Sequence, residues 1–506
     1  MDIQNLSFRR NLKFLGGSVV GLAGLLAVWI VGGNYIASVH EKEIEQDLAA
    51  YAQRFPKTEP NDAALKLGAS LAKVGFGGGA GFSSADRSIG SRADFKSSKD
   101  DQKAFEEIRQ ELKQYLDAEI AKPNDTVNPP SEKLQRYLAS KQTALTELRQ
   151  QVLNNEVPHW GTDISWILEG DMTVRGPDYL WQANIQKVLA LDILEKYRKG
   201  QTEAAAEMLE VSWKINQSST ESPLFMPQLV GLIVTKYPAG VMRKVDRLPA
   251  QWQQRLQERD YRESILTSLQ ADYLFQFKFL QDFLWKHSWS SLLDWYSSSR
   301  EAIGVSTSGH GILSLLQTET SYLYSPTLEE KILDWTLSHV LVWFKPVIKP
   351  YIRFCAIDTY HAYKRSLAAS RQQNVCASDS APAKDFAWWN YISRTSGRTS
   401  TNFPSQTSKA AKSMLDLELT QKILQVKALA AKTGKWPASV PDMKSSICPG
   451  AKWLYRVAPD GTMSISFSEK PKWLEERLKS RKGLPFTYND KTPPELKNRA
   501  STRPKR

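Results

Sequence analysis

Residues 14–39 read FLGGSVVGLAGLLAVWIVGGNYIASV, a run of 26 positions without one charged side chain. An α-helix needs about 20 predominantly apolar residues to cross the ~30 Å hydrocarbon core of a bilayer. The run therefore predicts a transmembrane helix near the start of a 506-residue chain. An uncleaved anchor is favoured over a cleaved signal peptide, whose apolar region would span only about 7 to 15 residues.

Charged residues flank this segment asymmetrically. Arg9, Arg10 and Lys13 precede it, whereas four of the five charged residues at positions 41–47 are acidic. Cytoplasmic flanks of membrane helices carry an excess of Lys and Arg. The flanks predict that the N-terminus, residues 1–13, is cytoplasmic. The bulk of the chain would then lie on the extracytoplasmic side, in the periplasm or a lumen. This topology predicts the lipid bilayer as a binding partner of the chain.

Small residues within the apolar run indicate a possible contact between the transmembrane helices of two copies of the chain. Gly17 and Gly21 form a Gly-x-x-x-Gly pair, a spacing that lets the backbones of two membrane helices approach closely. The pair predicts a homodimer through the transmembrane helix, against the alternative that glycine is simply common in such helices. No other protein partner is specified by the sequence.

Composition limits the class of protein. Hydrophobic residues make up 41% of the chain, which is enough for real cores and excludes a wholly disordered polypeptide. Three cysteines, at positions 355, 376 and 448, are too few for a disulfide scaffold or a clustered zinc module. Cys376 and Cys448 form a disulfide if the outer side is oxidising and the two lie close together, which sequence alone leaves open.

The pattern of apolar residues, glycines and charges predicts a mainly α fold with a small C-terminal α+β module. The expected layout has seven parts: a cytoplasmic N-terminus at 1–13, a transmembrane helix at 14–39, a stalk and Gly/Ser-rich linker at 40–100, a helical domain at 101–368, a linker at 369–407, a helix-plus-hairpin module at 408–490, and a basic tail at 491–506.

Helix pairs dominate the expected helical domain. Residues 105–120 and 131–152 predict an antiparallel hairpin, with Ser131 as the N-cap of its second helix. A second pair comprises residues 180–198 and a helix that starts at Thr202. The apolar stretch that follows, from 224 to 242, is interrupted by two prolines and a lysine, so it predicts a buried helix rather than a second membrane span.

The last expected unit changes from helical to strand periodicity. Leu415 to Ala430 carries one apolar stripe at helical spacing, and Gly434 ends it. Apolar residues then alternate over 453–457 and again over 463–467, on either side of the turn residues Pro459-Asp460-Gly461. This pattern predicts a β-hairpin.

The run from Leu415 to Phe467 resembles the C-terminal segment of pseudopilin-like proteins and of uncharacterised membrane-anchored bacterial proteins. The resemblance covers roughly a tenth of the chain and implies a bacterial envelope protein. It departs from true pilins because no prepilin peptidase site precedes the membrane helix and roughly 400 residues separate that helix from the hairpin. It transfers no catalytic residue.

Residues 271–344 are the most aromatic stretch of the chain. Three interpretations compete for it. The rings fill the core between helices, or Trp285, Trp289 and Trp295 lie at the level of the lipid headgroups, or the tryptophans stack on sugar rings. An indole suits the headgroup level because it has an apolar body and a polar edge.

Residues capable of catalysis form no coherent set. None of the six histidines has metal-ligand spacing, and no Gly-x-Ser-x-Gly occurs, so no catalytic residue, cofactor or metal is predicted. Two enzymatic alternatives stay open. The motifs at 70–73 (SLAK), 400–402 (STN) and 432–434 (KTG) follow the chain order of penicillin-binding enzymes. Glu169 and Asp171, near several tryptophans, have the composition of a glycosidase acid pair.

The net charge of +13 is concentrated near the C-terminus, where residues 470–506 carry twelve Lys or Arg against four acids. Such a tail attracts anionic lipids, wall polymers or an acidic partner, or is simply solvated. Nucleic acid is not an expected partner for a tail outside the membrane. The sequence predicts a membrane-anchored helical scaffold or interaction protein without enzymatic activity; the alternative is a hydrolase or glycan-binding protein that acts on the cell wall.

Overall fold

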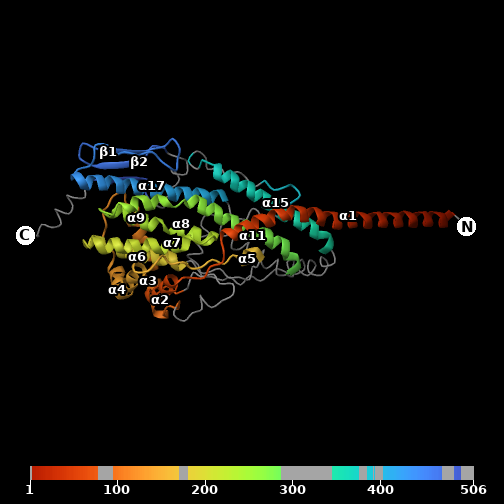
Figure 1. The fold of residues 1–506 in the computed structure, drawn as a ribbon, viewed down its shortest axis with the longest axis horizontal. Helices are drawn as coiled ribbons and strands as arrows, with labels where there is room; N and C mark the ends of the chain where they lie inside the picture. Colours follow the sequence, from red (N-terminus) through yellow and green to blue (C-terminus); the bar gives the residue numbers. More distant parts are fainter. Residues whose placement is uncertain are drawn as a thin grey trace, which may run out of the picture.

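The computed structural model describes residues 3–77, 95–169, 180–286, 345–374, 376, 385–390, 393, 403–469 and 484–491. These residues are mostly helical and include one small antiparallel sheet near the C-terminus, as the sequence predicted (Figure 1). The basic residues after position 491, and most of the expected linker at 369–407, lie outside the described part of the chain.

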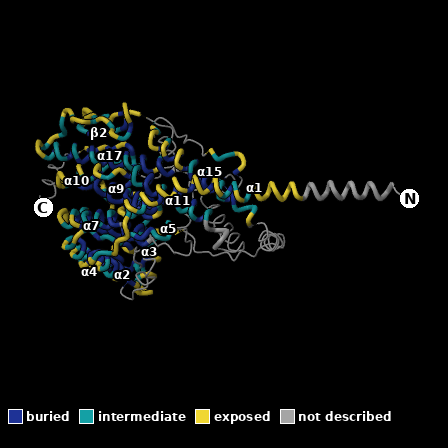
Figure 2. The backbone as a smooth tube through the Cα atoms, turned by 45° about the vertical axis from the view of Figure 1, so that its right-hand side comes forward, coloured by how far each residue is buried: buried dark blue, intermediate teal, exposed yellow. Residues whose placement is uncertain are grey.

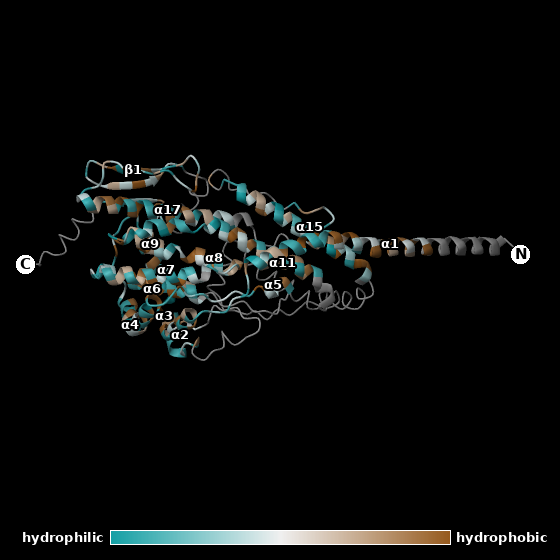
Figure 3. Cartoon of the chain, viewed as in Figure 1, coloured by the Kyte–Doolittle hydropathy of each residue, from teal (hydrophilic) through white to brown (hydrophobic). Residues whose placement is uncertain are grey.

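Helix α1 (Ile3–Arg54) has two environments along its 52 residues. It is about 78 Å long at 1.5 Å per residue. From Val20 to Val31 its apolar side chains are largely exposed, and Figure 2 shows these turns projecting from the body. Figure 3 shows hydrophobic residues on the same projecting turns. The helix is long and apolar enough to cross a membrane.

The second half of α1 is part of the body rather than an exposed stalk. Ala37, Ile44, Leu48 and Tyr51 are buried in the main hydrophobic core. Ile44, Leu48 and Tyr51 follow one another at intervals of four and three residues, so they share one face of the helix. The projecting half of α1 and the body are therefore joined by uninterrupted helix.

The body consists mainly of α-helices, and residues at the helix ends determine where several of them begin or end. Ser131 caps its helix as predicted, because its side chain accepts a hydrogen bond from the Leu134 amide. Gly200 takes a φ of +76° between the second predicted pair of helices. The body helices are α2 (Asp62–Val74), α3 (Lys99–Ile120), α4 (Glu132–Leu153), α5 (Ser165–Glu169), α6 (Leu180–Arg198), α7 (Thr202–Thr220), α8 (Phe225–Val234), α9 (Lys236–Lys244), α10 (Gln251–Glu258), α11 (Tyr261–Lys286) and α15 (Lys345–Gln372).

The single buried helix expected over residues 224–242 is two helices. Helix α8 ends at Val234 and α9 begins at Lys236. Pro227 and Pro238 each lie in the first turn of one of these helices, where a missing backbone N–H is tolerated. A proline inside one continuous helix would instead remove a hydrogen bond, which explains the break.

Helix α17 (Phe403–Thr433) forms the wall between two cores. Its Leu417 and Leu424 belong to the main core of the body. Its Leu419 and Ile423 belong to a second core beneath the sheet. Gly434, with a φ of +68°, ends the helix as predicted.

The sheet confirms the predicted hairpin and adds a strand. Strands β1 (Trp453–Val457) and β2 (Met463–Phe467) pair antiparallel, with Trp453 opposite Phe467. Strand β3 (Thr487–Asp490) pairs with β2, so the order is β1-β2-β3. The sequence did not reveal β3 because it is four residues long and mostly polar.

Candidate functional site

The first candidate site is the junction between α1 and α15. The indole Nε1 of Trp29 donates to the Val347 carbonyl at 2.8 Å, and Lys364 Nζ donates to Asp47 Oδ2 at 2.8 Å. The two contacts join residues 318 and 317 positions apart in sequence. A constant offset means that the helices run parallel, so α15 begins beside the apolar part of α1 and continues into the body.

Close approach of the two helices depends on Gly33. A Cβ at that position would lie 2.8 Å from Cβ of Pro350, which is closer than side-chain carbons normally come. The glycine therefore lets the first turns of α15 pack directly on the α1 backbone.

Arg353 is the central residue of this junction. Its Nε donates to Glu41 Oε1 at 2.8 Å, and its other nitrogens donate to the carbonyl and side-chain oxygens of Asn34, at 3.0 and 2.9 Å, and to Ser38 Oγ at 2.7 Å. Only 12% of the Arg353 side chain and 6% of the Glu41 side chain are exposed. The hydrogen bond to Glu41 raises the pKa of the guanidinium.

A second ionic contact lies further into the body. Burial by itself raises the pKa of the Asp47 carboxyl, but hydrogen bonds from Lys364 and Tyr360 outweigh it, so this pKa falls below its usual value. Burial and the neighbouring Asp47 carboxylate raise the pKa of the Tyr360 hydroxyl. Together with Arg353, these contacts fix the body to α1 at several levels.

The second candidate site is a buried polar junction where the C-terminal module meets the body. The Lys427 ammonium, 1% exposed, donates to Asp125 Oδ2 at 3.2 Å and to the carbonyls of Arg243 and Val245 at 2.8 and 3.1 Å. It also lies 5.4 Å from the ring centre of Tyr488 on β3. One side chain of α17 thus joins the α3–α4 loop, the end of α9 and the sheet.

Arg243 extends this junction. Its Nε donates to Thr420 Oγ1 at 2.9 Å, and its two terminal nitrogens donate to the carbonyls of Asp416 at 2.8 Å and Pro485 at 2.7 Å. The side chain is 3% exposed. A buried cation is tolerated where its donors are satisfied in this way.

Lys244 contributes to the same junction from the end of α9. Its Nζ donates to the carbonyls of Lys122, at 3.0 Å, and Asn124. Burial lowers the pKa of this ammonium from 10.5 to about 7. The nearby carboxylates of Asp125 and Glu119 act in the opposite direction but do not overcome burial.

Lys244 predicts a pH dependence of stability. Between about pH 7 and pH 10 the unfolded chain holds a proton at position 244 that the folded chain releases, so stability rises with pH by up to about 1.4 kcal/mol per unit. Below that window both states are protonated and the contribution is constant. Denaturant unfolding at pH 7, 8 and 9 should give a shallower slope for Lys244→Met than for the native chain. Equal slopes of stability against pH for the two proteins would contradict a lowered pKa of Lys244.

A polar cavity of about 530 Å³ opens beside this junction. Its lining residues are Asn124, Asp125, Thr126, Tyr197, Thr462, Asn489, Asp490 and Lys491. The Asp125 carboxylate in its wall is paired with Lys427, so it supports the packing of the module rather than acting as a free base. Within the described residues, no cluster of three or more His, Cys, Asp or Glu could hold a metal ion.

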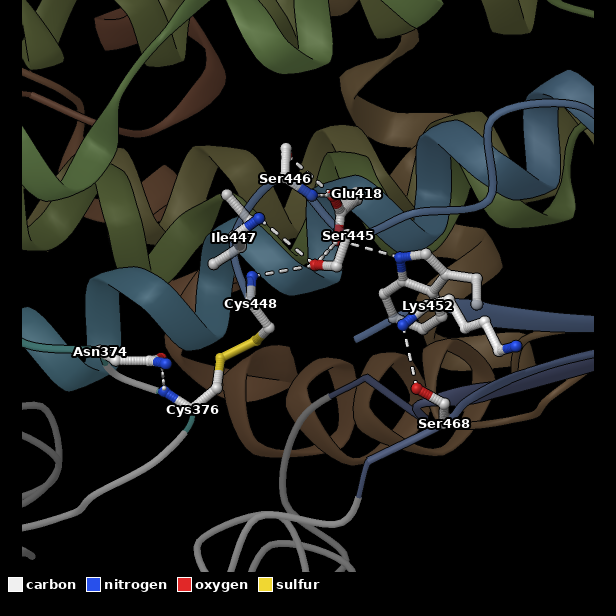
Figure 4. Close-up of a disulfide and its surroundings, with 10 residues drawn as sticks. Asn374, Cys376, Glu418, Ser445, Ser446, Ile447, Cys448, Lys452 and Ser468 are labelled. Atoms are coloured by element: carbon white, nitrogen blue, oxygen red, sulfur yellow. Dashed lines mark hydrogen bonds between the residues drawn. A yellow bond between two sulfur atoms is a disulfide. The ribbon is translucent and has the colours of Figure 1, made fainter. Parts of the chain in front are cut away.

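The C-terminal module is also joined to the body covalently. Cys376, just after α15, and Cys448 form a disulfide with Cα atoms 5.6 Å apart, which resolves the pairing left open by the sequence (Figure 4). Beside it, the buried Glu418 carboxylate accepts hydrogen bonds from Ser445 Oγ at 2.7 Å and Trp453 Nε1 at 2.9 Å. The loop that carries Cys448 is thereby held against α17.

Removing this disulfide should destabilise the protein measurably. It closes a loop of 72 residues, for which chain entropy gives roughly 4 kcal/mol. The double substitution Cys376→Ser/Cys448→Ser should lower the free energy of unfolding by about 2–5 kcal/mol. Denaturant titration with and without dithiothreitol is the measurement. The variant should be insensitive to reductant, and a native chain that is equally insensitive would contradict the prediction.

Two segments of the penicillin-binding motif lie on different helices, α2 and α17. Lys73 lies on the surface of α2, 62% exposed, and donates to Glu147 Oε2 at 2.7 Å. Lys432 and Thr433 end helix α17, and Gly434 follows it, so they line no strand. Residues 400–402 lie outside the described residues.

The other predicted residues are placed as follows. Glu169 ends α5 and is exposed, whereas Asp171 lies outside the described residues, so their separation is not defined. Trp285 lies in α11 without a described side chain, and Trp289 and Trp295 fall outside the described ranges. For the aromatic stretch, the described rings of Tyr273, Phe277 and Phe279 support the core interpretation, because each is buried.

Gly17 and Gly21 both lie on α1, and Gly21 lies within its exposed turns. A Cβ at Gly21 would have no neighbouring atom within 4 Å, so the chain itself leaves that position open. The predicted homodimer face is therefore not covered by the body at Gly21.

Sequence reasoning missed the buried cations Arg243, Lys244, Arg353 and Lys427. One signal was present: Lys427 follows Val426 within the apolar stripe that also contains Ile423 and Ala430. A lysine on an apolar face indicates either an exposed edge or a buried ion pair. The partner Asp125 is 302 positions away, and no periodicity relates the two.

Comparison of this chain with family models, curated proteins and solved structures finds no match. The pseudopilin-like resemblance of residues 415–467 stays a prediction.

Proposed function

We propose that this protein is a single-pass, membrane-anchored scaffold whose helical body binds other proteins on the extracytoplasmic side of a bacterial envelope or internal membrane. The observation that carries the proposal is the continuity of α1. Its exposed apolar turns lead without a break into a half that is buried in the main core. A body attached in this way holds a constant position relative to the bilayer, which suits a scaffold.

Two further observations support the orientation. Basic residues precede the apolar run and acidic residues follow it, which favours a cytoplasmic N-terminus. The Cys376–Cys448 disulfide is of a kind that persists in oxidising compartments such as the periplasm. Both favour a body outside the cytoplasm.

The proposed dimer contact lies in the membrane. Gly17 and Gly21 lie four residues apart on one face of α1, and Gly21 is not covered by the body. A second copy of α1 can approach along that face with its backbone. Without a second copy, lipid would cover this face of α1.

The topology is tested with an impermeant maleimide on intact cells. Met226 is 49% exposed in the body, and the free cysteine Cys355 is buried, so Met226→Cys provides one reactive site. We expect labelling without permeabilisation, with the unsubstituted chain as the unlabelled control. Labelling only after permeabilisation would contradict an envelope location and would leave the body in the cytoplasm or in the lumen of an internal membrane.

The scaffold role is tested by cross-linking the full-length protein in native membranes and identifying what it carries. A reproducible set of membrane or envelope proteins would support the proposal. Isolation of the protein alone, with muropeptides or other glycans bound, would instead support the cell-wall alternative.

A further inference from the structure

Residues 385–390 form a short loop that runs along α15 toward the end of the body from which α1 projects. Arg365 donates to the Asp385 carbonyl at 3.0 Å, Asp358 Oδ2 accepts from the Ala387 amide at 3.0 Å, and the Tyr351 hydroxyl donates to the Trp389 carbonyl at 3.1 Å. As the loop advances from 385 to 389, its partners on α15 step back from 365 to 351. Its tip is therefore Trp388-Trp389.

The tip is held firmly by the chain that returns from it. Asn390, fully buried, donates to Asp358 Oδ2 at 2.7 Å and to the Cys355 carbonyl at 3.2 Å. The backbone N–H of Asn390 also donates to the Ala387 carbonyl at 3.0 Å, which closes a turn around the two tryptophans. These bonds fix the backbone of the loop on α15.

The tryptophan side chains nevertheless face outward. Trp388 is 82% exposed and Trp389 is 36% exposed. Burying an indole is among the largest apolar gains available to a folded chain, so a tryptophan fixed in so exposed a position is unusual. Such a position indicates that these indole rings contact an apolar environment outside the chain itself.

The register between α15 and α1 gives the level of this tip. Tyr351 holds the tip and lies two residues before Arg353, which contacts Asn34 and Ser38 on α1. The tip is thus level with Asn34 and its neighbour Tyr35. The Tyr35 side chain is itself 72% exposed.

This level coincides with the expected edge of the bilayer. About 20 helical residues span the hydrocarbon core, so a core that begins at Phe14 ends near Gly33. The polar headgroup region adds about 5–8 Å on each side. Tyr35, two residues or about 3 Å beyond Gly33, lies in that region, where Trp and Tyr are enriched.

We propose that Trp388 and Trp389 insert into the lipid headgroup region of the leaflet from which α1 emerges, forming a second contact between the body and the membrane. The inference rests on the proposed spanning of the bilayer by α1. The partner is the lipid surface, recognised through the apolar ring and the polar N–H edge of each indole. With α1 as the first contact, the second restricts the tilt and rotation of the body.

The test uses the full-length protein in phosphatidylcholine/phosphatidylglycerol vesicles with an environment-sensitive NBD label at Trp388→Cys. Two matched variants carry the same label: Val28→Cys, 70% exposed on α1, and Val457→Cys, 41% exposed on the sheet. The vesicles contain, or lack, lipids spin-labelled close to the headgroup. We expect blue-shifted emission and quenching by spin-labelled lipid at positions 388 and 28, and neither at position 457.

The outcomes distinguish this inference from the function on which it rests. Quenching at 28 with an unquenched, unshifted label at 388 would overturn the second contact and leave the anchor intact. No quenching at 28 would overturn the proposed membrane span as well. A blue shift at 388 that depends on protein concentration and is insensitive to spin-labelled lipid would assign the tip to contact between copies, and would also overturn the inference.

Discussion

Replacing Lys427 with methionine should lower the free energy of unfolding by about 3–5 kcal/mol. The substitution keeps most of the side-chain volume. It leaves the carboxylate of Asp125, whose side chain is 6% exposed, without the cation that donates to it. The carbonyls of Arg243 and Val245 lose a donor at the same time. Denaturant unfolding of the full-length protein in detergent micelles measures the change.

Two control variants isolate the cause. Lys73→Met removes an ion pair to Glu147 whose side chains are 62% and 47% exposed, so it should cost less than about 1 kcal/mol. Asp125→Asn combined with Lys427→Met removes both buried charges and should recover part of the loss. If the double variant were as unstable as the sum of the two single variants, the ion pair would not be the cause.

Replacing Arg353 with methionine should have an effect of similar size at the opposite junction. The variant leaves Glu41 buried without its guanidinium partner, for which about 3–5 kcal/mol is expected. The loss should be local, because Arg353 connects α15 to the part of α1 where the body begins. Hydrogen exchange should show faster exchange of the α15 amides, with smaller changes in α6 and α7.

Lys364→Met is the matched control for Arg353→Met, since it removes an ionic contact on the same pair of helices. The Lys364 side chain is 45% exposed, so its loss should cost less than about 1 kcal/mol. Equal effects of the two variants would mean that burial does not decide the strength of this junction. Glu41→Gln combined with Arg353→Met should again recover part of the stability.

The two junctions lie at different parts of the body and have different consequences. Arg353 fixes the orientation of the body on α1, so its loss should loosen the attachment of the body to that helix. Lys427, Arg243 and Lys244 hold the C-terminal module against the body through α17 and the α3–α4 loop. Their loss should expose the module while leaving α1 in place.

The sequence by itself determined the features that depend on neighbouring residues. The apolar run of α1, the N-cap at Ser131, the pair of helices separated at Gly200 and the hairpin around Pro459-Asp460-Gly461 all rest on interactions within a few positions of the chain. Each is visible as a periodicity, a cap or a turn residue, because local sterics and hydrogen bonding select it.

Only the tertiary structure decided which distant residues meet. Arg353 finds Glu41 across 312 positions, and Lys427 finds Asp125 across 302. The level of Trp388-Trp389 against α1 likewise follows from the packing of α15. No periodicity relates such residues, because helix packing brings them together only after each helix has formed, and a buried charge then selects the partner that satisfies it.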